Sequence, residues 1–273
     1  MTSALVAGLG VSAVRAATLD ISIAAQPNYN NMVADAKLRG DAAGGLQDAN
    51  LGNGAGGSNR FYANYFADGV TLDSRMTHFV QRFDVSSIPA GSIITSATLT
   101  TFFANQTANN RIFANVKLSQ LLPGKAWVEG VGQNPATDGS VTWNSQAGGS
   151  IPWTAPGATA DIVLASTQTF DLVGVDGTAT AISRDITSWV QDWVNTPANN
   201  TGMLWWGGSS ADSDSGNRYF HFGTKEDGAG PAGEASAAAP TLVIQYTVVP
   251  EPGAVVLLAA GFLASLTVRR RIS

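Results

Sequence analysis

Three stretches of this chain alternate hydrophobic with polar residues, and this period of two constrains the fold more than any other feature of the sequence. Residues 93–103 read IITSATLTTFF, residues 112–118 read IFANVKL and residues 242–248 read LVIQYTV. Their apolar positions on one face are Ile93, Ala97, Leu99 and Phe103, then Ile112, Ala114, Val116 and Leu118, then Leu242, Ile244, Tyr246 and Val248. Successive side chains of a β-strand point to opposite faces, so the pattern predicts strands with one buried face. Thirty glycines and eleven prolines supply turns between short strands. The sequence therefore predicts an all-β fold, an antiparallel β-sandwich.

One segment, DITSWVQDWVN at residues 185–195, departs from this period. Ile186, Trp189, Val190 and Trp193 recur there at helical spacing, which predicts one short helix with its tryptophans in the core. Asp185 is placed to accept from backbone N–H groups of the first turn, and Pro197 prevents the helix from continuing.

The N-terminus suggests export. Residues 4–14 (ALVAGLGVSAV) form a short apolar run, and Val14 and Ala16 are compact enough for signal-peptidase cleavage after Ala16. No Lys or Arg precedes the run, so a basic n-region would have to lie upstream of the first residue given. We expect residues 1–16 to be a signal peptide, truncated at its start, and residues 17–248 to be the sandwich domain.

The C-terminal segment, residues 249–273, predicts a hydrophobic helix that is inserted into a membrane. An apolar run from Ala254 to Val268 lies between Pro250-Glu251-Pro252 and Arg269-Arg270-Arg271. As a helix the run spans roughly 22 Å, short of a hydrocarbon core of about 30 Å, although arginine stems can reach toward the head groups. Positive flanks stay on the cytoplasmic side, so the sandwich would lie outside the cytoplasm.

Charge and cysteine content restrict the partners of the exported domain. Without Arg15, Glu251 and the three terminal arginines, the 15 basic and 20 acidic residues fall to 11 and 19, a net charge of −8. This charge argues against nucleic acid, which is bound mainly by neutralising phosphates. The chain has no cysteine, so thiol chemistry and disulfides are excluded.

The order of several sequence blocks resembles the DNRLRE domain family, exported β-sandwich modules related to a carbohydrate-binding module family. The blocks are KLRGDAAGGLQDANLGNG (37–54), QRFDVSSIPAGSIITSATLTTFF (81–103), WVEG (127–130), VTWN (141–144), DITSWVQDWVNTPANNTGMLWW (185–206) and HFGTKE with APTLVIQYT (221–247). The naming motif of the family reads DAKLRG here. The resemblance implies a jelly-roll-like sandwich and polysaccharide binding, and it does not imply catalysis.

The C-terminal segment is similar to a PEP-CTERM sorting signal. It contains Pro250, Glu251 and Pro252, the apolar run, and Arg269, Arg270 and Arg271 in the order of that family. The resemblance implies transient anchoring in the inner membrane, recognition by an exosortase-type enzyme and processing near the Pro-Glu-Pro tripeptide. We expect the mature protein at the cell surface or in the extracellular matrix.

The sequence offers no catalytic motif. His78 and His221 are far apart and lie in strand-like stretches, which favours structural roles. Nucleophile-elbow and HExxH motifs are absent, and two GxGxxG matches lie in glycine-rich loops without the strand and helix that a dinucleotide site needs. Glu129 would need a second carboxylate at a defined separation for glycoside hydrolysis, which a sequence does not show. We predict no catalytic residue and no cofactor.

A structural Ca²⁺ remains an open alternative. Asp212, Asp214 and Asn217 in DSDSGN resemble the oxygen-rich start of a calcium loop, but Gly216 and Gly223 occupy positions where ligands belong. A solvated turn is the competing interpretation. Asp48 and Asn50 form a second candidate pair.

Tryptophans are the candidate sugar platforms, because sugars stack their apolar faces on aromatic rings. Trp205 and Trp206 are neighbours in a strand-like stretch, so one of them is expected to reach solvent. Trp127 and Trp153 flank loop-like sequence and are further candidates.

Two function classes follow from these observations. The first is a non-catalytic surface or matrix protein that binds or embeds in extracellular polysaccharide. The second is a structural surface protein without a sugar ligand, and a polysaccharide-degrading enzyme is a third, less favoured class. An exposed aromatic strip with nearby Asn, Asp or Arg would favour the first class.

Overall fold

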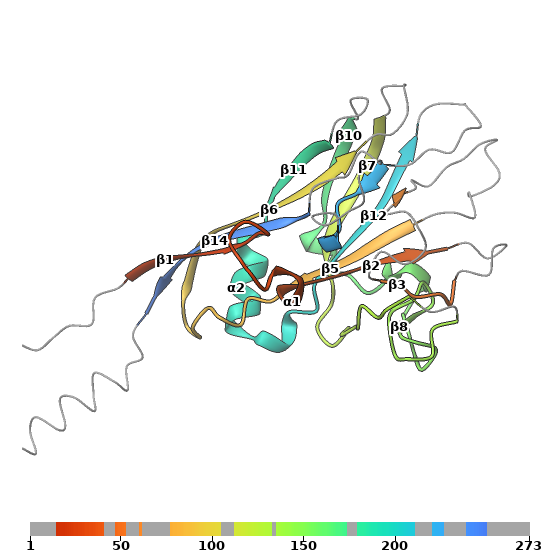
Figure 1. The fold of residues 1–273 in the computed structure, drawn as a ribbon, viewed down its shortest axis with the longest axis horizontal. Coiled ribbons are helices and arrows are strands. Elements are labelled where there is room, and N and C mark those ends of the chain that lie inside the picture. The colour runs from red at the N-terminus through yellow and green to blue at the C-terminus, as the bar shows by residue number, and fades with distance from the viewer. Residues whose placement is uncertain are drawn as a thin grey trace, which may run out of the picture.

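Two antiparallel sheets pack face to face as a sandwich in the computed structural model of this chain (Figure 1). The residues that the structure describes are 15–40, 47–52, 60–61, 77–104, 112–132, 135–173, 179–210, 220–226 and 239–249. Within them each sheet has six strands, and a nine-residue helix lies against one end of the sandwich. The predicted antiparallel β-sandwich with one short helix is confirmed.

The first sheet has the strand order β1-β14-β6-β13-β4, and β11 also pairs with β6. Its strands are β1 (Arg15–Ile21), β4 (Arg60–Phe61), β6 (Ile93–Ala104), β11 (Ala179–Asp185), β13 (Phe220–Phe222) and β14 (Thr241–Val248). The last strand in the sequence, β14, therefore lies inside the sheet between β1 and β6.

The second sheet has the strand order β10-β7-β12-β5-β2-β3. Its strands are β2 (Val33–Arg39), β3 (Leu51–Gly52), β5 (Thr77–Phe83), β7 (Ile112–Gln120), β10 (Gln168–Val173) and β12 (Met203–Ser210). The remaining elements are the pair β8 (Ser145–Ala147) and β9 (Ile151–Pro152), the helices α1 (Tyr29–Met32) and α2 (Thr187–Asn195), and the 3₁₀ turns η1 (Pro156–Ala158), η2 (Leu164–Ser166) and η3 (Pro197–Asn199).

The main core lies between the two sheets, and the alternating stretches supply much of it. The buried residues that the alternation predicted are Ala97, Leu99, Phe103, Val116, Leu118, Leu242 and Ile244. Phe103, Trp205 and Phe222 form an aromatic group at the centre, with ring centroids 5.3–5.7 Å apart. Edge-to-face contacts of this kind add to the burial of apolar area.

One position of the predicted pattern is wrong. Ile93 is 54% exposed, and Ile94 is buried in its place. The pairing of β14 with β6 shifts between Gln245, opposite Ser96, and Tyr246, opposite Ile94. The irregularity inserts one residue into β6, and a shift of one residue exchanges the two faces of a strand.

Helix α2 follows the predicted pattern. Trp189, Val190 and Trp193 are buried in the main core, and the helix packs against β6. The Asp185 carboxylate accepts from the Thr187 backbone N–H at 2.8 Å, as expected of a residue at a helix start. The helix ends at Asn195, and Pro197 opens a 3₁₀ turn directly afterwards.

A second, smaller core covers the outer face of the second sheet. Val80 of β5 and Leu204 of β12 face outward there, and residues 121–162 fold back over them. The covering segment contributes Leu121, Trp127, Val141, Trp143, Trp153, Ala158 and Ile162. Strands β5 and β12 are therefore buried on both faces.

The predicted signal peptide and sorting segment lie almost wholly outside the described residues. The described chain begins at Arg15, which pairs with Val248 in the β1–β14 ladder. Residues 1–14 and 250–273 are not described, and they include Pro250, Glu251, Pro252, Arg269, Arg270, Arg271 and the predicted C-terminal helix. None of the helices in the described part is long and apolar enough to cross a membrane.

Candidate functional site

Trp205 belongs to the main core and offers no ring face to a ligand. The side chain is fully buried among Phe103, Phe170 and Phe222, and its Nε1 donates to Oε1 of Gln81 at 3.3 Å. Its predicted role as a sugar platform requires exposure, which this position lacks. Strand β12 turns Trp205 toward the other sheet, so Trp206 points the opposite way.

Trp127 and Trp153 are buried in the second core. Trp127 is 2% exposed, and its Nε1 donates to the carbonyl of Thr201 at 2.9 Å. Trp153 is 4% exposed, and its Nε1 donates to the carbonyl of Thr142 at 2.9 Å. The expectation that they are exposed is wrong, because the segment that carries them folds onto the sheet and satisfies both indole N–H groups internally.

Trp206 is the one predicted tryptophan that the structure leaves partly exposed. Nζ of Lys117 lies 4.4 Å from its ring centroid, a cation–π contact. Its Nε1 donates to Oγ of Ser119 at 3.0 Å, which fixes the ring. In the part of the chain that the structure describes, Trp206 is therefore a single, oriented aromatic ring beside a cation and not part of an exposed aromatic strip.

A groove with a mixed polar and apolar lining lies at the helix end of the sandwich. It consists of two adjoining cavities of about 500 and 330 Å³, which share Asn31 in their walls. The larger cavity is lined by residues of β2, β5, the turn after β5 and helix α2, and the smaller one by the segment before and within α1 together with Lys225. Neither cavity was predicted from the sequence.

Two residues of the groove wall carry a buried polar atom that lacks a hydrogen-bond partner among the described residues. Trp193 and Asn200 both line the larger cavity. Nε1 of Trp193 can only donate and Oδ1 of Asn200 can only accept, and neither makes a hydrogen bond among the described residues. Nδ2 of Asn200 donates to the carbonyl of Phe83 at 2.9 Å, so this amide is held in place. Both atoms are almost completely buried, so in this structure they are not exposed to the cavity.

Charged and hydroxyl groups complete the wall of the larger cavity. Arg82, Asp84 and Ser86 come from β5 and the turn after it. The Arg82 guanidinium stacks over the buried Trp127 ring, with Cζ 5.3 Å from the centroid. Burial lowers the pKa of Arg82, while Asp84 and Glu129 raise it, and arginine stays charged under ordinary conditions. In the sequence, these residues belong to two blocks: QRFDVSS contains Arg82, Asp84 and Ser86, and TPANNTG contains Asn200. These blocks were the sequence signal that could have pointed to the cavity.

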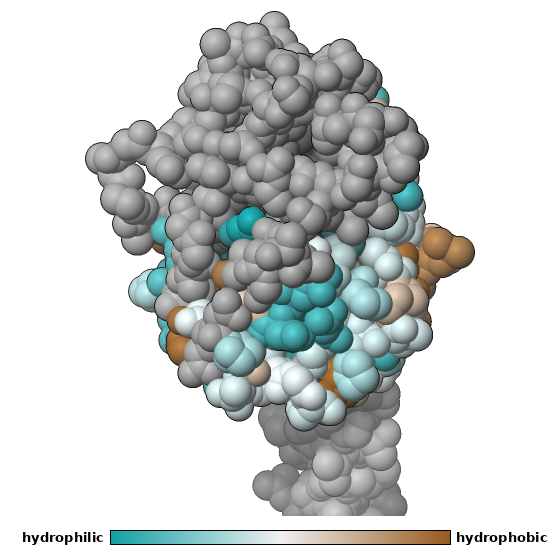
Figure 2. Space-filling view, turned by 90° about the vertical axis from the view of Figure 1, so that its right-hand side faces the viewer, coloured by the Kyte–Doolittle hydropathy of each residue, from teal (hydrophilic) through white to brown (hydrophobic). Residues whose placement is uncertain are grey.

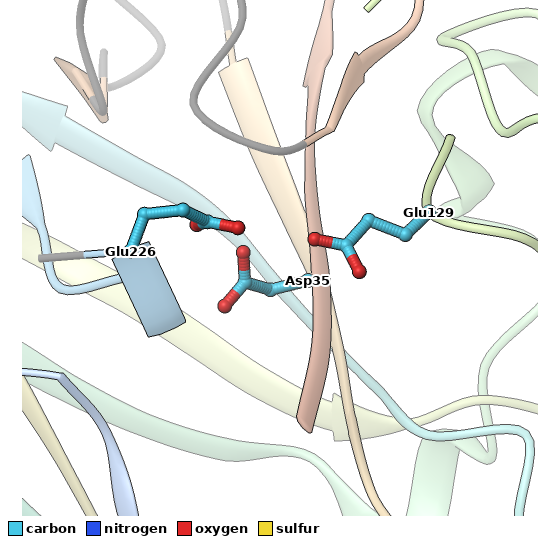
Figure 3. A group of neighbouring side chains, drawn as sticks. All are labelled: Asp35, Glu129 and Glu226. Carbon is cyan, nitrogen blue, oxygen red and sulfur yellow. The ribbon is translucent and has the colours of Figure 1, made fainter. Parts of the chain in front are cut away.

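Three carboxylates and one lysine meet at a second site, which we call the Lys225 cluster: Asp35, Glu129, Lys225 and Glu226. Asp35 lies on β2, Glu129 in the segment after β7, and Lys225 and Glu226 directly after β13 (Figure 3). Each carboxylate offers an oxygen within 4.8 Å of the others, and Figure 3 shows the three side chains pointing toward one another. The ammonium of Lys225 contacts Glu129 and lies 3.9 Å from Glu226, so these carboxylates already share a cation from the chain itself.

Asp35 is the most buried member of this cluster. Its Oδ2 accepts from the backbone N–H of Lys225 at 2.8 Å. Burial raises the pKa of Asp35 well above its ordinary value, and the nearby charge of Glu226 raises it further. Asp35 is the first residue of the DAKLRG motif, and Glu226 is the last residue of the HFGTKE block. The sequence therefore showed two separate motifs and did not show that their side chains meet.

His78 and His221 are buried in strands β5 and β13. Nδ1 of His78 lies 2.8 Å from the carbonyl oxygen of Gly157, and its ring packs on Trp143 at 4.8 Å between centroids. The structural role predicted for His78 is confirmed.

The metal candidates divide into two groups. Asp212, Asp214 and Asn217 lie outside the described residues. Asp48 and Asn50 serve internal hydrogen bonds: Asp48 accepts from Nδ2 of Asn144 at 2.8 Å, and Nδ2 of Asn50 donates to the carbonyl of Val141 at 2.8 Å. Asn50 thus ties loop segments together.

The end of the sandwich drawn at the right of Figure 1 is mainly hydrophilic where it is described. Figure 2 shows this end from outside, with hydrophilic residues at the centre of the coloured surface and hydrophobic ones apart at the margins. Among the described residues of this view there is no broad apolar patch of the kind that marks large protein interfaces.

Comparison with known proteins gives no relative: no family model matches the chain, and no curated protein matches it. The resemblance of its sequence blocks to the DNRLRE family therefore stays a prediction.

Proposed function

We propose that this chain is an exported, non-catalytic surface or matrix protein that binds extracellular polysaccharide in the groove at the helix end of the sandwich. The observation that carries the proposal is the wall of the larger cavity, where the polar side chains of Asp84, Ser86 and Asn200 lie among apolar ones. A sugar hydroxyl both donates and accepts hydrogen bonds, so it can pair with carboxylate, hydroxyl and amide groups of this kind.

The composition of the groove supports the same ligand class. Sugar rings have apolar C–H faces and polar edges, and the wall offers Met32, Val85 and Ile88 beside Asn31, Ser86 and Asp84. Cavities of several hundred Å³ hold small ligands, and two adjoining ones suit consecutive units of a chain. Hydrogen bonds across a partly open groove contribute modestly, so weak binding per site is expected.

The export and sorting steps belong to this proposal. The signal peptide at residues 1–16 would direct export, and the segment 249–273 would anchor the chain transiently until an exosortase-type enzyme processes it near Pro250. Membership of the DNRLRE family, with a jelly-roll arrangement of the strands, is part of the same proposal. Glu129 is held by Lys225, and neither groove cavity is lined by Asp35, Glu129 or Glu226, so we assign these carboxylates no role in polysaccharide cleavage.

Gel-retention electrophoresis of the full chain in a panel of neutral and acidic polysaccharides tests the proposal. We expect retention by at least one of them, weakened several-fold by Asn31→Ala, because Asn31 borders both cavities. Thr98→Ala, an exposed change on β6, is the matched control and should leave retention unchanged.

Trp206→Ala distinguishes the groove from the partly exposed tryptophan. If this change abolishes retention while Asn31→Ala has no effect, the binding surface lies at Trp206 and the groove assignment is wrong. Absence of retention on every polysaccharide would favour the structural surface protein without a sugar ligand.

A further inference from the structure

The Lys225 cluster brings together side chains that are far apart in the sequence. Lys225 and Glu129 are 96 positions apart, and Lys225 and Asp35 are 190 apart. The side chains of Lys225 and Glu129 are 12% and 14% exposed, and Nζ of Lys225 contacts Oε2 of Glu129. An amine and a carboxyl group are thus held in contact in a largely desolvated site.

We propose that Lys225 and Glu129 become covalently joined by an amide bond between Nζ of Lys225 and Cδ of Glu129. This inference is independent of the polysaccharide proposal, because it requires no bound ligand.

The step is a condensation and needs no reagent from outside. The Lys225 ammonium and the Glu129 carboxylate form one N–C bond, one C–O bond of Glu129 breaks, and the oxygen leaves as water with two protons from the ammonium. The amide nitrogen keeps the third proton. The positive and negative charges cancel, so atoms, protons and charge balance.

The surroundings favour this step over the ordinary ion pair. The two side chains are largely buried, so little water reaches the contact between Nζ of Lys225 and the Glu129 carboxyl group. Reacting groups held in contact behave as if present at about 10⁵ M or more. Lys225 also lines the smaller groove cavity, which gives the released water a path to solvent.

Asp35 is placed to carry the proton. One of its carboxyl oxygens lies within 4.8 Å of a carboxyl oxygen of Glu129, and its raised pKa means that it holds a proton where an exposed aspartate does not. Asp35 can give this proton to the departing oxygen and recover one from the nitrogen, which leaves it unchanged. We therefore assign it as a positioning and proton-carrying residue for the condensation.

The bond would tie the segment after β7 to the segment after β13. Closing a long loop in the unfolded chain stabilises the folded state, as disulfides do. In a chain without cysteine this amide would supply a covalent constraint that disulfides supply elsewhere.

Mass spectrometry of the denatured full chain tests the proposal. We expect the intact mass to be lower than the sequence mass by one water molecule. Trypsin should fail to cut after Lys225, and the peptide that begins after Arg218 should be found joined to the peptide that begins after Lys125. A wild-type chain with the full sequence mass, and with Lys225 cut by trypsin, would show an ion pair only and overturn the proposal.

Two variants sharpen the test. Lys225→Arg keeps a positive charge, but its guanidinium does not lose its proton and so does not attack; the full mass is expected. Asp35→Asn keeps an acceptor for the Lys225 N–H and removes the proton carrier, so the cross-linked fraction should fall several-fold. Loss of water that persists in Lys225→Arg would place the reaction elsewhere, and complete cross-linking in Asp35→Asn would overturn the role of Asp35.

Discussion

Nδ1 of His78 lies 2.8 Å from the carbonyl oxygen of Gly157, with the imidazole packed on the Trp143 ring. Because a carbonyl only accepts, Nδ1 carries the proton of the neutral ring. Burial lowers the pKa of His78 to about 4, although the hydrogen bond to Gly157 opposes this shift. His78 packs against the second core, so its protonation should change the free energy of unfolding of the whole domain.

Acid should destabilise the fold through His78. Its folded pKa is below the unfolded value, so the unfolded chain binds more protons, and stability falls as the pH drops from about 6.5 to about 4. The contribution is at most about 3 kcal/mol. Urea unfolding of wild type and His78→Gln across this range checks it: wild type should lose more stability than the variant. Parallel losses would show that other groups dominate.

Asp35 should change the stability with pH in the opposite direction to His78. Its folded pKa is raised, so its contribution to stability is present at low pH and is lost as the pH rises through that value. The comparison uses a Lys225→Arg background, in which no cross-link is expected. In that background, the protein with Asp35→Asn should be more stable above neutral pH than the protein that keeps Asp35. Thermal melts at acid and alkaline pH measure this, and a less stable Asn variant at alkaline pH would contradict it.

Gly157→Ala should destabilise the second core. A Cβ there would lie 2.7 Å from Cη2 of Trp143 and 2.9 Å from Nδ1 of His78, at a φ of +75°. Gly149 has a φ of +73° with nothing within 4 Å, so Gly149→Ala isolates the backbone strain. We expect Gly157→Ala to cost about 1–3 kcal/mol more than Gly149→Ala in urea unfolding. Equal costs would mean that the neighbours move aside.

The neighbouring tryptophans should respond differently to truncation. Trp205→Ala leaves a cavity among Phe103, Phe170 and Phe222 and should cost about 3–5 kcal/mol. Trp206→Ala removes a partly exposed ring and should cost clearly less. Differential scanning calorimetry compares the two, and a larger loss at Trp206 would reverse the assigned orientation of β12.

A chain that ends at Glu226 should not fold. It lacks β14, which pairs with both β1 and β6, so β1 would lose its partner and β6 one of its partners. A chain that ends at Val249 keeps this strand and is the control. Cooperative melting of the shorter chain at the same temperature as the control would show that β14 is dispensable.

The sequence by itself predicted the elements whose pattern is local. Leu99 and Phe103 in β6, Leu242 and Ile244 in β14, and Trp189 and Trp193 in α2 are buried as their periods require. Each of these patterns is set by the backbone geometry of its own element, so no distant residue was needed to read it.

The tertiary structure alone decided the exposure of the tryptophans and the composition of both sites. Trp127 and Trp153 are buried because residues 121–162 fold onto the outer face of the second sheet, which no local pattern encodes. Ile94 replaces Ile93 in the core because of a pairing irregularity with another strand. Asp35, Glu129 and Lys225 meet only when the two sheets and a loop come together, and Trp193 and Asn200 line the same cavity only through packing. Contacts between residues many positions apart depend on which surfaces pack together, and alternation along one strand carries no information about that choice.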